Sequence, residues 1–115
     1  MNKKLIIEEL KRIVRDTQDV LVVVEGKNDK YAVLNLGYRR VICLNKPLFE
    51  IIEGLESEKE VIILTDLDRK GRELYHILKS GLERRGVRVL EKPRKIIKRL
   101  GYTHIEGINI DEDNF

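Results

Sequence analysis

Short apolar runs alternate with amphipathic stretches along the whole chain, and this alternation predicts the secondary structure. Four runs rich in Val, Ile and Leu are typical of strands buried on both faces of a parallel sheet, at residues 20–24, 40–44, 60–65 and 87–90. Apolar residues at helical spacing predict helices over residues 3–15, 29–36, 45–55, 70–85 and 93–100. After Gly101 the pattern fits either a short helix or an extended tail.

The order of these elements predicts an α/β fold with a mostly parallel four-stranded sheet flanked by helices. Strands that alternate with helices through connections of this length form right-handed crossovers. A length of 115 residues favours a single domain over residues 1–115. Sheets of this kind place their binding and catalytic groups outside the carboxyl ends of the strands. The residues that follow each strand are therefore the first candidates for function.

Composition excludes several classes of protein. The single cysteine, Cys43, cannot form an internal disulfide or complete a cysteine zinc site. The two histidines, His76 and His104, are too far apart in sequence for a histidine-pair metal motif. No apolar run approaches the roughly 18 residues of a membrane span, and acids at positions 8 and 9 exclude a signal peptide, so we expect a cytoplasmic protein. Charged residues make up 37% of the chain, an excess of Lys, Arg and Glu that favours a thermophilic source.

Acidic residues follow two of the predicted strands. The strand at 20–24 runs into Glu25, and the strand at 60–65 runs into Asp66 and Asp68, which point the same way in an extended segment. If these two strands are neighbours, three carboxylates meet at one rim of the sheet. Each pair then costs about 1 kcal/mol at roughly 4 Å in water. A raised pKa, a basic side chain or a divalent cation must offset that repulsion.

Of these three, a divalent cation is the one that also predicts a substrate class. Oxygen ligands without histidine or cysteine favour Mg²⁺ or Mn²⁺ over zinc. Magnesium held by a few carboxylates completes its shell with water and phosphate oxygens, so the expected substrate is a phosphate ester. The plainer alternative is that Asp68 only caps the next helix and Glu25 is a solvated strand end.

Glycines and basic residues beside these acids suit phosphate binding. Gly26 allows a sharp turn after Glu25, with the backbone close to a ligand. Gly71 lies at the start of the following helix, whose N-terminus suits an anion. Three basic residues that flank the acids are candidates for further phosphate contacts: Lys27, Arg69 and Lys70.

Two segments together carry a resemblance to a known family. The segments Glu25-Gly26-Lys27-Asn28-Asp29 and Asp66-Leu67-Asp68-Arg69-Lys70-Gly71 resemble the motifs of the Toprim domain, and the likeness extends over roughly residues 18–92. That domain occurs in topoisomerases, bacterial primases, nucleases and recombination proteins. The version seen here looks most like the ribonuclease that matures 5S ribosomal RNA and like small stand-alone members.

The resemblance implies a fold and a set of roles. It implies a four-stranded, mostly parallel sheet with Mg²⁺ held by Asp66 and Asp68. It implies that Glu25 is a metal ligand or the general acid/base of phosphodiester chemistry. Glu106 is either one more acid near the site or a surface residue.

We therefore expect an enzyme dependent on Mg²⁺ or Mn²⁺ that acts on nucleic-acid phosphodiesters, most simply a nuclease of the RNA-processing type. The alternative is a non-catalytic module that binds metal and nucleic acid and acts with a partner protein. Receiver domains and haloacid-dehalogenase-type phosphatases fit less well, because each places an acidic pair after the first strand. Four tyrosines are expected to pack at the edge of the core, which leaves none for strand transfer: Tyr31, Tyr38, Tyr75 and Tyr102.

A basic stretch between residues 84 and 99 is a candidate surface for RNA or DNA. It contains one acid, Glu91, and eight basic residues that would follow a phosphate backbone: Arg84, Arg85, Arg88, Lys92, Arg94, Lys95, Lys98 and Arg99. The alternative is a solvated face. No aromatic residue interrupts the stretch, so it predicts no base stacking. The acidic tail at 111–113 is expected to be solvated, with Phe115 docked on the domain.

Overall fold

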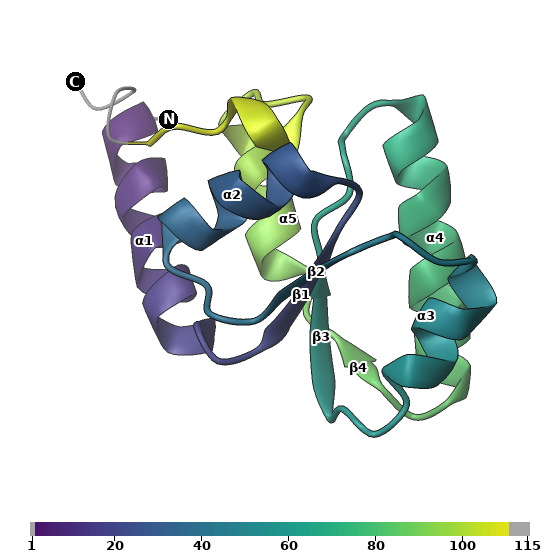
Figure 1. The fold of residues 1–115 in the computed structure, drawn as a ribbon. Helices are drawn as coiled ribbons and strands as arrows, with labels where there is room; N and C mark the ends of the chain where they lie inside the picture. Colours follow the sequence, from purple (N-terminus) through teal and green to yellow (C-terminus); the bar gives the residue numbers. More distant parts are fainter. Residues whose placement is uncertain (1, 111–115) are drawn as a thin grey trace.

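Strands and helices alternate along residues 2–110, the part of the chain that this computed structural model describes. The strands are β1 (Leu21–Val24), β2 (Val41–Cys43), β3 (Glu60–Ile63) and β4 (Arg88–Val89). The helices are α1 (Lys3–Thr17), α2 (Lys27–Leu36), α3 (Leu48–Gly54), α4 (Arg69–Arg84), α5 (Lys92–Arg99) and a 3-10 turn η1 (Ile105–Gly107). Figure 1 shows their arrangement.

The four strands form one parallel sheet in the order β2-β1-β3-β4. In the middle of β1, Val23 lies opposite Ile42 of β2 on one side and Ile63 of β3 on the other. The predicted α/β fold is confirmed, and the sheet is wholly rather than mostly parallel. Because β1 and β3 are neighbours, the acidic segments that follow them leave the sheet side by side.

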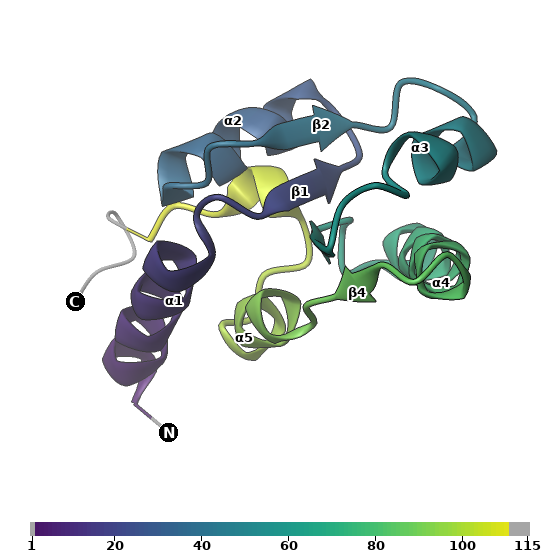
Figure 2. The same cartoon turned by 90° about the horizontal axis from the view of Figure 1, so that it is seen from below.

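Helices cover both faces of the sheet, as the view in Figure 2 shows, with α1, α2 and α5 on one side and α3 and α4 on the other. Strand β1 is buried on both faces and serves both layers. Val22 and Val24 pack with α1, α5 and the segment around η1, while Leu21 and Val23 pack with α3 and α4. This two-sided burial explains why the strands are continuous apolar runs.

All the predicted element boundaries lie within two residues of the observed ones except the start of α3. Helix α2 begins at Lys27, directly after Gly26, and not at residue 29. Helix α3 begins at Leu48 with Pro47 as its N-cap, and not at residue 45. Proline suits this place because its fixed φ leads into a helix and its missing N–H has no helical partner. The predictions for the tail at 111–113 and for Phe115 lie outside the described residues.

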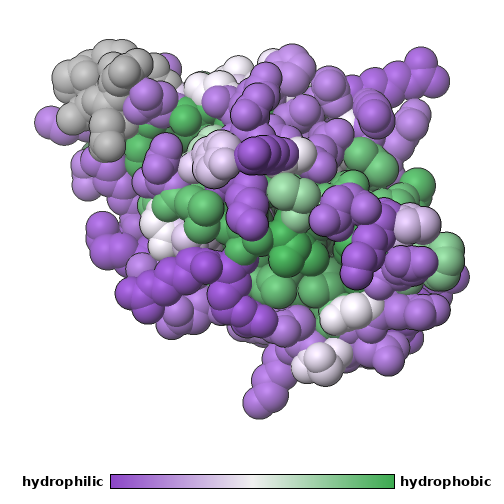
Figure 3. All heavy atoms as spheres, in the orientation of Figure 1, coloured by the Kyte–Doolittle hydropathy of each residue, from purple (hydrophilic) through white to green (hydrophobic). Residues whose placement is uncertain are grey.

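The surface in Figure 3 is mainly hydrophilic, with apolar side chains gathered over the region of β2 and α3. A groove there is lined in part by Val41, Ile42, Cys43 and Ile51. Strand β2 is an edge of the sheet, which explains why its side chains are less covered than those of β1 and β3. Among the described residues, no helix combines the length and the apolarity needed to cross a membrane.

Candidate metal and phosphodiester site

The carboxyl ends of β1 and β3 bring Glu25 and Asp66 into direct contact. The backbone N–H of Asp66 donates to Oε2 of Glu25 over 2.8 Å, and the N–H of Leu64 donates to the carbonyl of Val23. The ladder between the two strands thus continues into the site through a side chain. Glu25 is half-buried and held by this bond at the rim of the sheet.

Asp68 caps helix α4 and also faces the site. Its Oδ1 accepts the N–H of Gly71 at 2.8 Å, which is the helix cap considered above. The N–H of Gly71 therefore already has Asp68 as its partner, and the small size of Gly71 lets α4 pack against the backbone of Asp66. A Cβ at position 71 would lie 1.8 Å from the carbonyl oxygen of Asp66. Only glycine lets α4 start this close to the Asp66 backbone.

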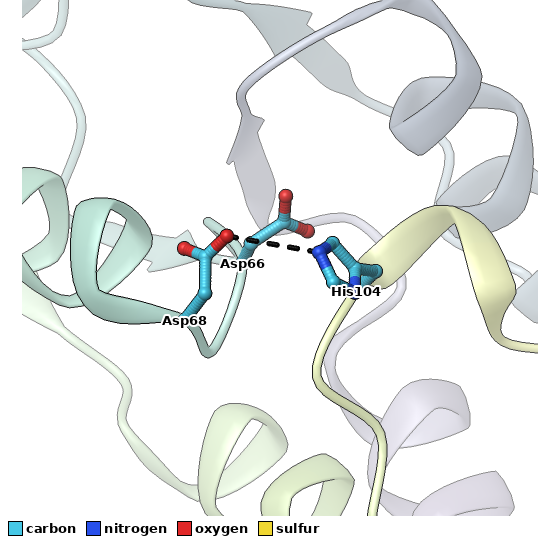
Figure 4. A group of neighbouring side chains, drawn as sticks. All are labelled: Asp66, Asp68 and His104. Atoms are coloured by element: carbon cyan, nitrogen blue, oxygen red, sulfur yellow. Dashed lines mark ion pairs between the residues drawn. The ribbon is translucent and has the colours of Figure 1, made fainter.

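The segment before η1 completes the site from the other end of the chain. The carbonyl of Thr103 accepts the N–H of Leu67, and the N–H of Ile105 donates to Oδ1 of Asp66, each at 2.8 Å. Nε2 of His104 lies 3.7 Å from Oδ2 of Asp68. Figure 4 shows His104 facing the two aspartates.

Asp66, Asp68 and His104 each present one ligand atom, and these three atoms lie within 4.8 Å of one another. The convergence of Asp66 and Asp68 agrees with the sequence analysis. His104 was not predicted, because the sequence offered no second histidine at a ligand spacing. Glu25 lies at the same rim, but it is not a member of this group of three.

A buried arginine, Arg94, holds the loop that follows β3 through hydrogen bonds to its backbone. Arg94 of α5 is 7% exposed, and its guanidinium donates to the carbonyl and Oγ1 of Thr65 and, over 2.9 Å, to the carbonyl of Asp66. It also stacks 4.6 Å from the ring centre of Tyr75. Burial lowers the pKa of Arg94, and the negative charges of Asp66 and Glu25 act in the opposite direction. Arg94 therefore positions the backbone that carries Asp66.

Asp29, the last residue of the Glu25–Asp29 motif, is a fourth acid near the site, for which the sequence predicted no role. It is 8% exposed, and its Oδ2 accepts the N–H of Gly26 at 3.0 Å across the start of α2. Burial raises the pKa of Asp29, assisted by the charges of Asp66 and Glu106. Of the two alternatives left open for Glu106, its exposed side chain fits a surface residue, while its charge still acts on Asp29.

The electrostatics of the rim suit a cation. Burial raises the pKa of Glu25 above its ordinary value, and the charges of Asp66, Asp68 and Asp29 raise it further. The guanidinium of Arg94 is turned to carbonyl oxygens rather than to these carboxylates. Clustered carboxylate oxygens with one imidazole nitrogen are a donor set for a divalent metal ion.

The predicted basic flank lies on the surface next to the acids. Lys27, Arg69 and Lys70 are all exposed, and Nε of Arg69 lies 3.4 Å from Oε1 of Glu73, one helical turn away. Nζ of Lys27 lies 6.0 Å from the ring centre of Tyr31. Tyr31 is 53% exposed, so the expectation that it packs at the core edge is wrong.

The other three tyrosines agree with core-edge packing. Tyr38 and Tyr75 are buried, and Tyr102 is half-buried against the core cluster that includes α1 and α5.

The basic stretch at 84–99 does not form one continuous cationic track. Arg94 points inward, as described above. Four other members form ion pairs with acids: Arg85 with Glu56, Arg88 with Glu60, Lys95 with Glu91 and Arg99 with Glu9. These residues lie on both sides of β4, where turns and the sheet separate them. Arg94 is therefore not part of the predicted phosphate-tracking surface, and contact of the remaining basic residues with a nucleic acid stays a prediction.

Comparison with known proteins identifies the family. The sequence profile of the Toprim domain matches residues 20–100. The chain belongs to the Toprim domain family. Toprim domains bind Mg²⁺ through acidic residues and their proteins act on nucleic acids, which indicates metal-dependent nucleic-acid chemistry for this Toprim chain.

Several relatives resemble the chain over most of its length. A UPF0292 protein from Thermococcus onnurineus is 43% identical over 103 residues, which cover 88% of this chain and 77% of that protein. A UPF0292 protein from Methanocaldococcus jannaschii is 36% identical over 93 residues, with 77% and 70% covered. A solved structure of an Aquifex aeolicus protein superposes with a TM-score of 0.74 at 36% identity and covers 93% of this chain and 98% of that one.

A DNA primase, DnaG of Aeropyrum pernix, shares a shorter segment. It is 39% identical over 56 residues, which cover 46% of this Toprim chain and 13% of the primase.

Proposed function

We propose that this Toprim chain is a divalent-metal-dependent nuclease that hydrolyses nucleic-acid phosphodiesters, most simply in RNA processing. The observation that carries the proposal is the convergence of Glu25, Asp66 and Asp68 at the carboxyl ends of two neighbouring parallel strands. Acids at this rim, in an α/β sheet, are placed where substrates bind.

Each acid has a role that its contacts support. Asp66 and Asp68 would hold the metal ion, with their orientation set by Ile105 and Gly71 respectively. A bound Mg²⁺ or Mn²⁺ polarises the phosphate and lowers the pKa of a coordinated water. Glu25, whose pKa is raised by burial, is suited to take and return a proton at Oε1 or Oε2, and it is also a candidate metal ligand.

The exposed residues around the acids supply contacts to a nucleic acid. Lys27, Arg69 and Lys70 are placed to bind phosphate oxygens and to stabilise charge that develops on the reacting phosphate. Gly26 is the extended N-cap residue of α2 and has no side chain there, so a phosphate could approach the backbone at the start of the helix. Tyr31, one turn into α2, offers an exposed ring on which an unpaired base could stack.

RNA is the preferred substrate in this proposal because the Glu25–Asp29 motif resembles that of the ribonuclease that matures 5S ribosomal RNA. The second candidate function is a binding module that holds metal and nucleic acid while a partner protein supplies catalysis. The open side of the site favours this alternative, because the side chains of Asp68 and His104 are 44% and 56% exposed and leave room for a partner protein.

A cleavage assay separates the two functions. The chain is incubated with end-labelled single- and double-stranded RNA and DNA, including a structured ribosomal precursor, in Mg²⁺, Mn²⁺ or EDTA. The nuclease proposal predicts cleavage in either metal, none in EDTA, and loss in both Glu25→Gln and Asp66→Asn. Binding of the same substrates without cleavage would favour the module and start a search for its partner protein.

The matched control is Glu53→Gln, which removes an exposed acid from α3. It should cleave like the unmodified chain. Equal loss in this variant would mean that net charge, and not the site, controls the activity.

A further inference from the structure

His104 is fixed at the acidic site by hydrogen bonds on both sides of it. The residue before it, Thr103, accepts the N–H of Leu67 through its carbonyl, and the residue after it, Ile105, donates its N–H to Oδ1 of Asp66. Both bonds are 2.8 Å long. They join the segment before η1 to the loop that carries both aspartates, although 36 or more residues separate the partners in sequence.

The ring of His104 is oriented with one nitrogen toward its own loop and the other toward the acids. Its Nδ1 lies 3.0 Å from Oγ1 of Thr103, and its Nε2 lies 3.7 Å from Oδ2 of Asp68 (Figure 4). In the tautomer in which Nδ1–H donates a hydrogen bond to Oγ1 of Thr103, Nε2 presents its lone pair to the acids. A hydrogen bond at the second nitrogen is the usual way in which proteins orient a metal-binding imidazole.

The separations also match those of ligands around one ion. Two ligands that each lie about 2.1 Å from a cation are roughly 3.0 Å apart when adjacent and 4.2 Å apart when opposite. The 3.7 Å between Nε2 and Oδ2 falls inside that range. All three ligand atoms lie within 4.8 Å of one another, so the rotation of one side chain would bring any wider pair into that range.

We propose that His104 supplies Nε2 as a third protein ligand beside Asp66 and Asp68, and that it makes this site select a first-row transition ion over Mg²⁺. Mg²⁺ prefers oxygen ligands and gives up its water reluctantly, so it gains little from an imidazole. Transition ions such as Mn²⁺, Co²⁺ and Zn²⁺ accept nitrogen readily. This inference deepens the proposed function and rests on it for its biological meaning, because it names the metal of the same site.

The two aspartates alone would not produce this preference for a transition ion over Mg²⁺. From its sequence the site consists only of carboxylates, and those favour Mg²⁺ or Mn²⁺. The structure adds a nitrogen from a segment 36 residues beyond Asp68. His104 is 56% exposed, so its removal takes no side chain from the core.

The test measures metal binding by the full chain in the absence of nucleic acid. Mn²⁺ and Mg²⁺ affinities are measured by calorimetry for the unmodified chain and for His104→Ala. Loss of a side chain that only hydrogen-bonds to a metal ligand typically costs about 10–100-fold in metal affinity, and loss of a ligand should cost at least as much. We expect the variant to bind Mn²⁺ at least about tenfold more weakly and Mg²⁺ within about threefold of the original.

Pulsed electron paramagnetic resonance on Mn²⁺ bound to the unmodified chain supplies a second readout that needs no variant. A directly bonded imidazole gives ¹⁴N modulation of the echo, which should disappear in His104→Ala. The matched control is His76→Ala, which removes the other, exposed histidine from α4 and should change neither the affinities nor the modulation.

Equal weakening of both metals in His104→Ala, or no weakening of either, would overturn the proposal. Absence of ¹⁴N modulation in the unmodified chain would overturn it as well. These outcomes are distinct from failure of the proposed function. A chain that binds Mn²⁺ through His104 but cleaves no nucleic acid would refute the nuclease and leave the ligand assignment intact.

Discussion

Asp68 is both the N-cap of α4 and a member of the acidic group, and the variant Asp68→Asn separates these two roles. As the N-cap of α4 it accepts the N–H of Gly71 through Oδ1, and asparagine caps helices about as well as aspartate. As a member of the acidic group it repels Asp66, whose ligand oxygen lies within 4.8 Å. The variant keeps the cap and removes the repulsion. We therefore expect it to be more stable than the unmodified chain when no metal is present.

The size of the effect follows from that separation. At the upper limit of 4.8 Å, two unit charges repel by about 0.9 kcal/mol in water and by about 3.5 kcal/mol at an effective dielectric constant of roughly 20. The Asp68 side chain is 44% exposed, so the lower value applies and the gain is about 1 kcal/mol. In a chain of this size that is a rise of about 3–6 °C in Tm.

The assay is thermal unfolding in EDTA and in excess Mg²⁺ or Mn²⁺. Metal at about a hundred times its Kd stabilises the native state by about 2.7 kcal/mol. The unmodified chain should show most of that rise and Asp68→Asn much less, so the order of the two Tm values reverses on adding metal.

Asp68→Ala is the control, because it removes the repulsion and the cap together. Loss of an N-cap costs about 1 kcal/mol, so the two effects should nearly cancel in EDTA. If Asp68→Asn is as unstable as a cap-deleted protein, or if metal leaves the Tm of the unmodified chain unchanged, then Asp68 is only a helix cap and the reasoning about the metal fails.

Three further predictions concern the support of the site. Arg94→Leu should lose about 3 kcal/mol of unfolding free energy in urea, because buried carbonyls lose their charged donor, and unchanged stability would contradict the positioning role. Gly71→Ala should lose about 2 kcal/mol and weaken Mn²⁺ binding in calorimetry, since its Cβ overlaps the Asp66 carbonyl, whereas Gly107→Ala, with open space around it, should leave metal binding intact. The pKa values of Glu25 and Asp29 are raised in the native state above their ordinary values of 4.5 and 3.8. At a pH above those ordinary values the native state therefore binds more protons than the unfolded state. Metal-free stability should therefore fall as the pH rises through that window and Mg²⁺ should restore it at neutral pH, and a urea midpoint that rises over the same range would contradict this sign.

The parts of the fold that follow local patterns could be predicted from the sequence. The strands are continuous apolar runs because both faces of the sheet are covered, and a run of four such residues, as in β1, has no competing helical pattern. The meeting of Glu25 with Asp66 and Asp68 followed from parallel strands ending at one rim, once β1 and β3 were assumed to be neighbours.

The parts of the site that depend on distant segments could not be predicted in the same way. His104 reaches the aspartates only because two backbone hydrogen bonds dock its segment on the loop after β3. The charged neighbours of Arg94 in sequence predict a basic surface, whereas the structure buries its side chain. Its spacing from Ile97 places it on the buried face of α5, and that helical period was the available signal.

Asp29 and Tyr31 show the limits of judging residues by type. Asp29 was part of a recognised motif, but its burial depends on how α2 packs beside η1, two elements that lie next to each other in Figure 1. Tyr31 was assigned to the core edge because tyrosine usually packs there, whereas α2 turns this ring outward beside Lys27.

The central claim is that the acids at the ends of β1 and β3 form a metal-dependent site that cleaves phosphodiesters. The most direct test is single-turnover cleavage of a labelled RNA hairpin at saturating Mn²⁺ by the unmodified chain, Asp66→Asn and the control Glu53→Gln. Metal stabilisation of a phosphoryl transition state is worth several kcal/mol, so Asp66→Asn should be slower by at least about a hundredfold while Glu53→Gln keeps its rate. Equal rates in all three proteins, or cleavage that persists in EDTA, would contradict the claim.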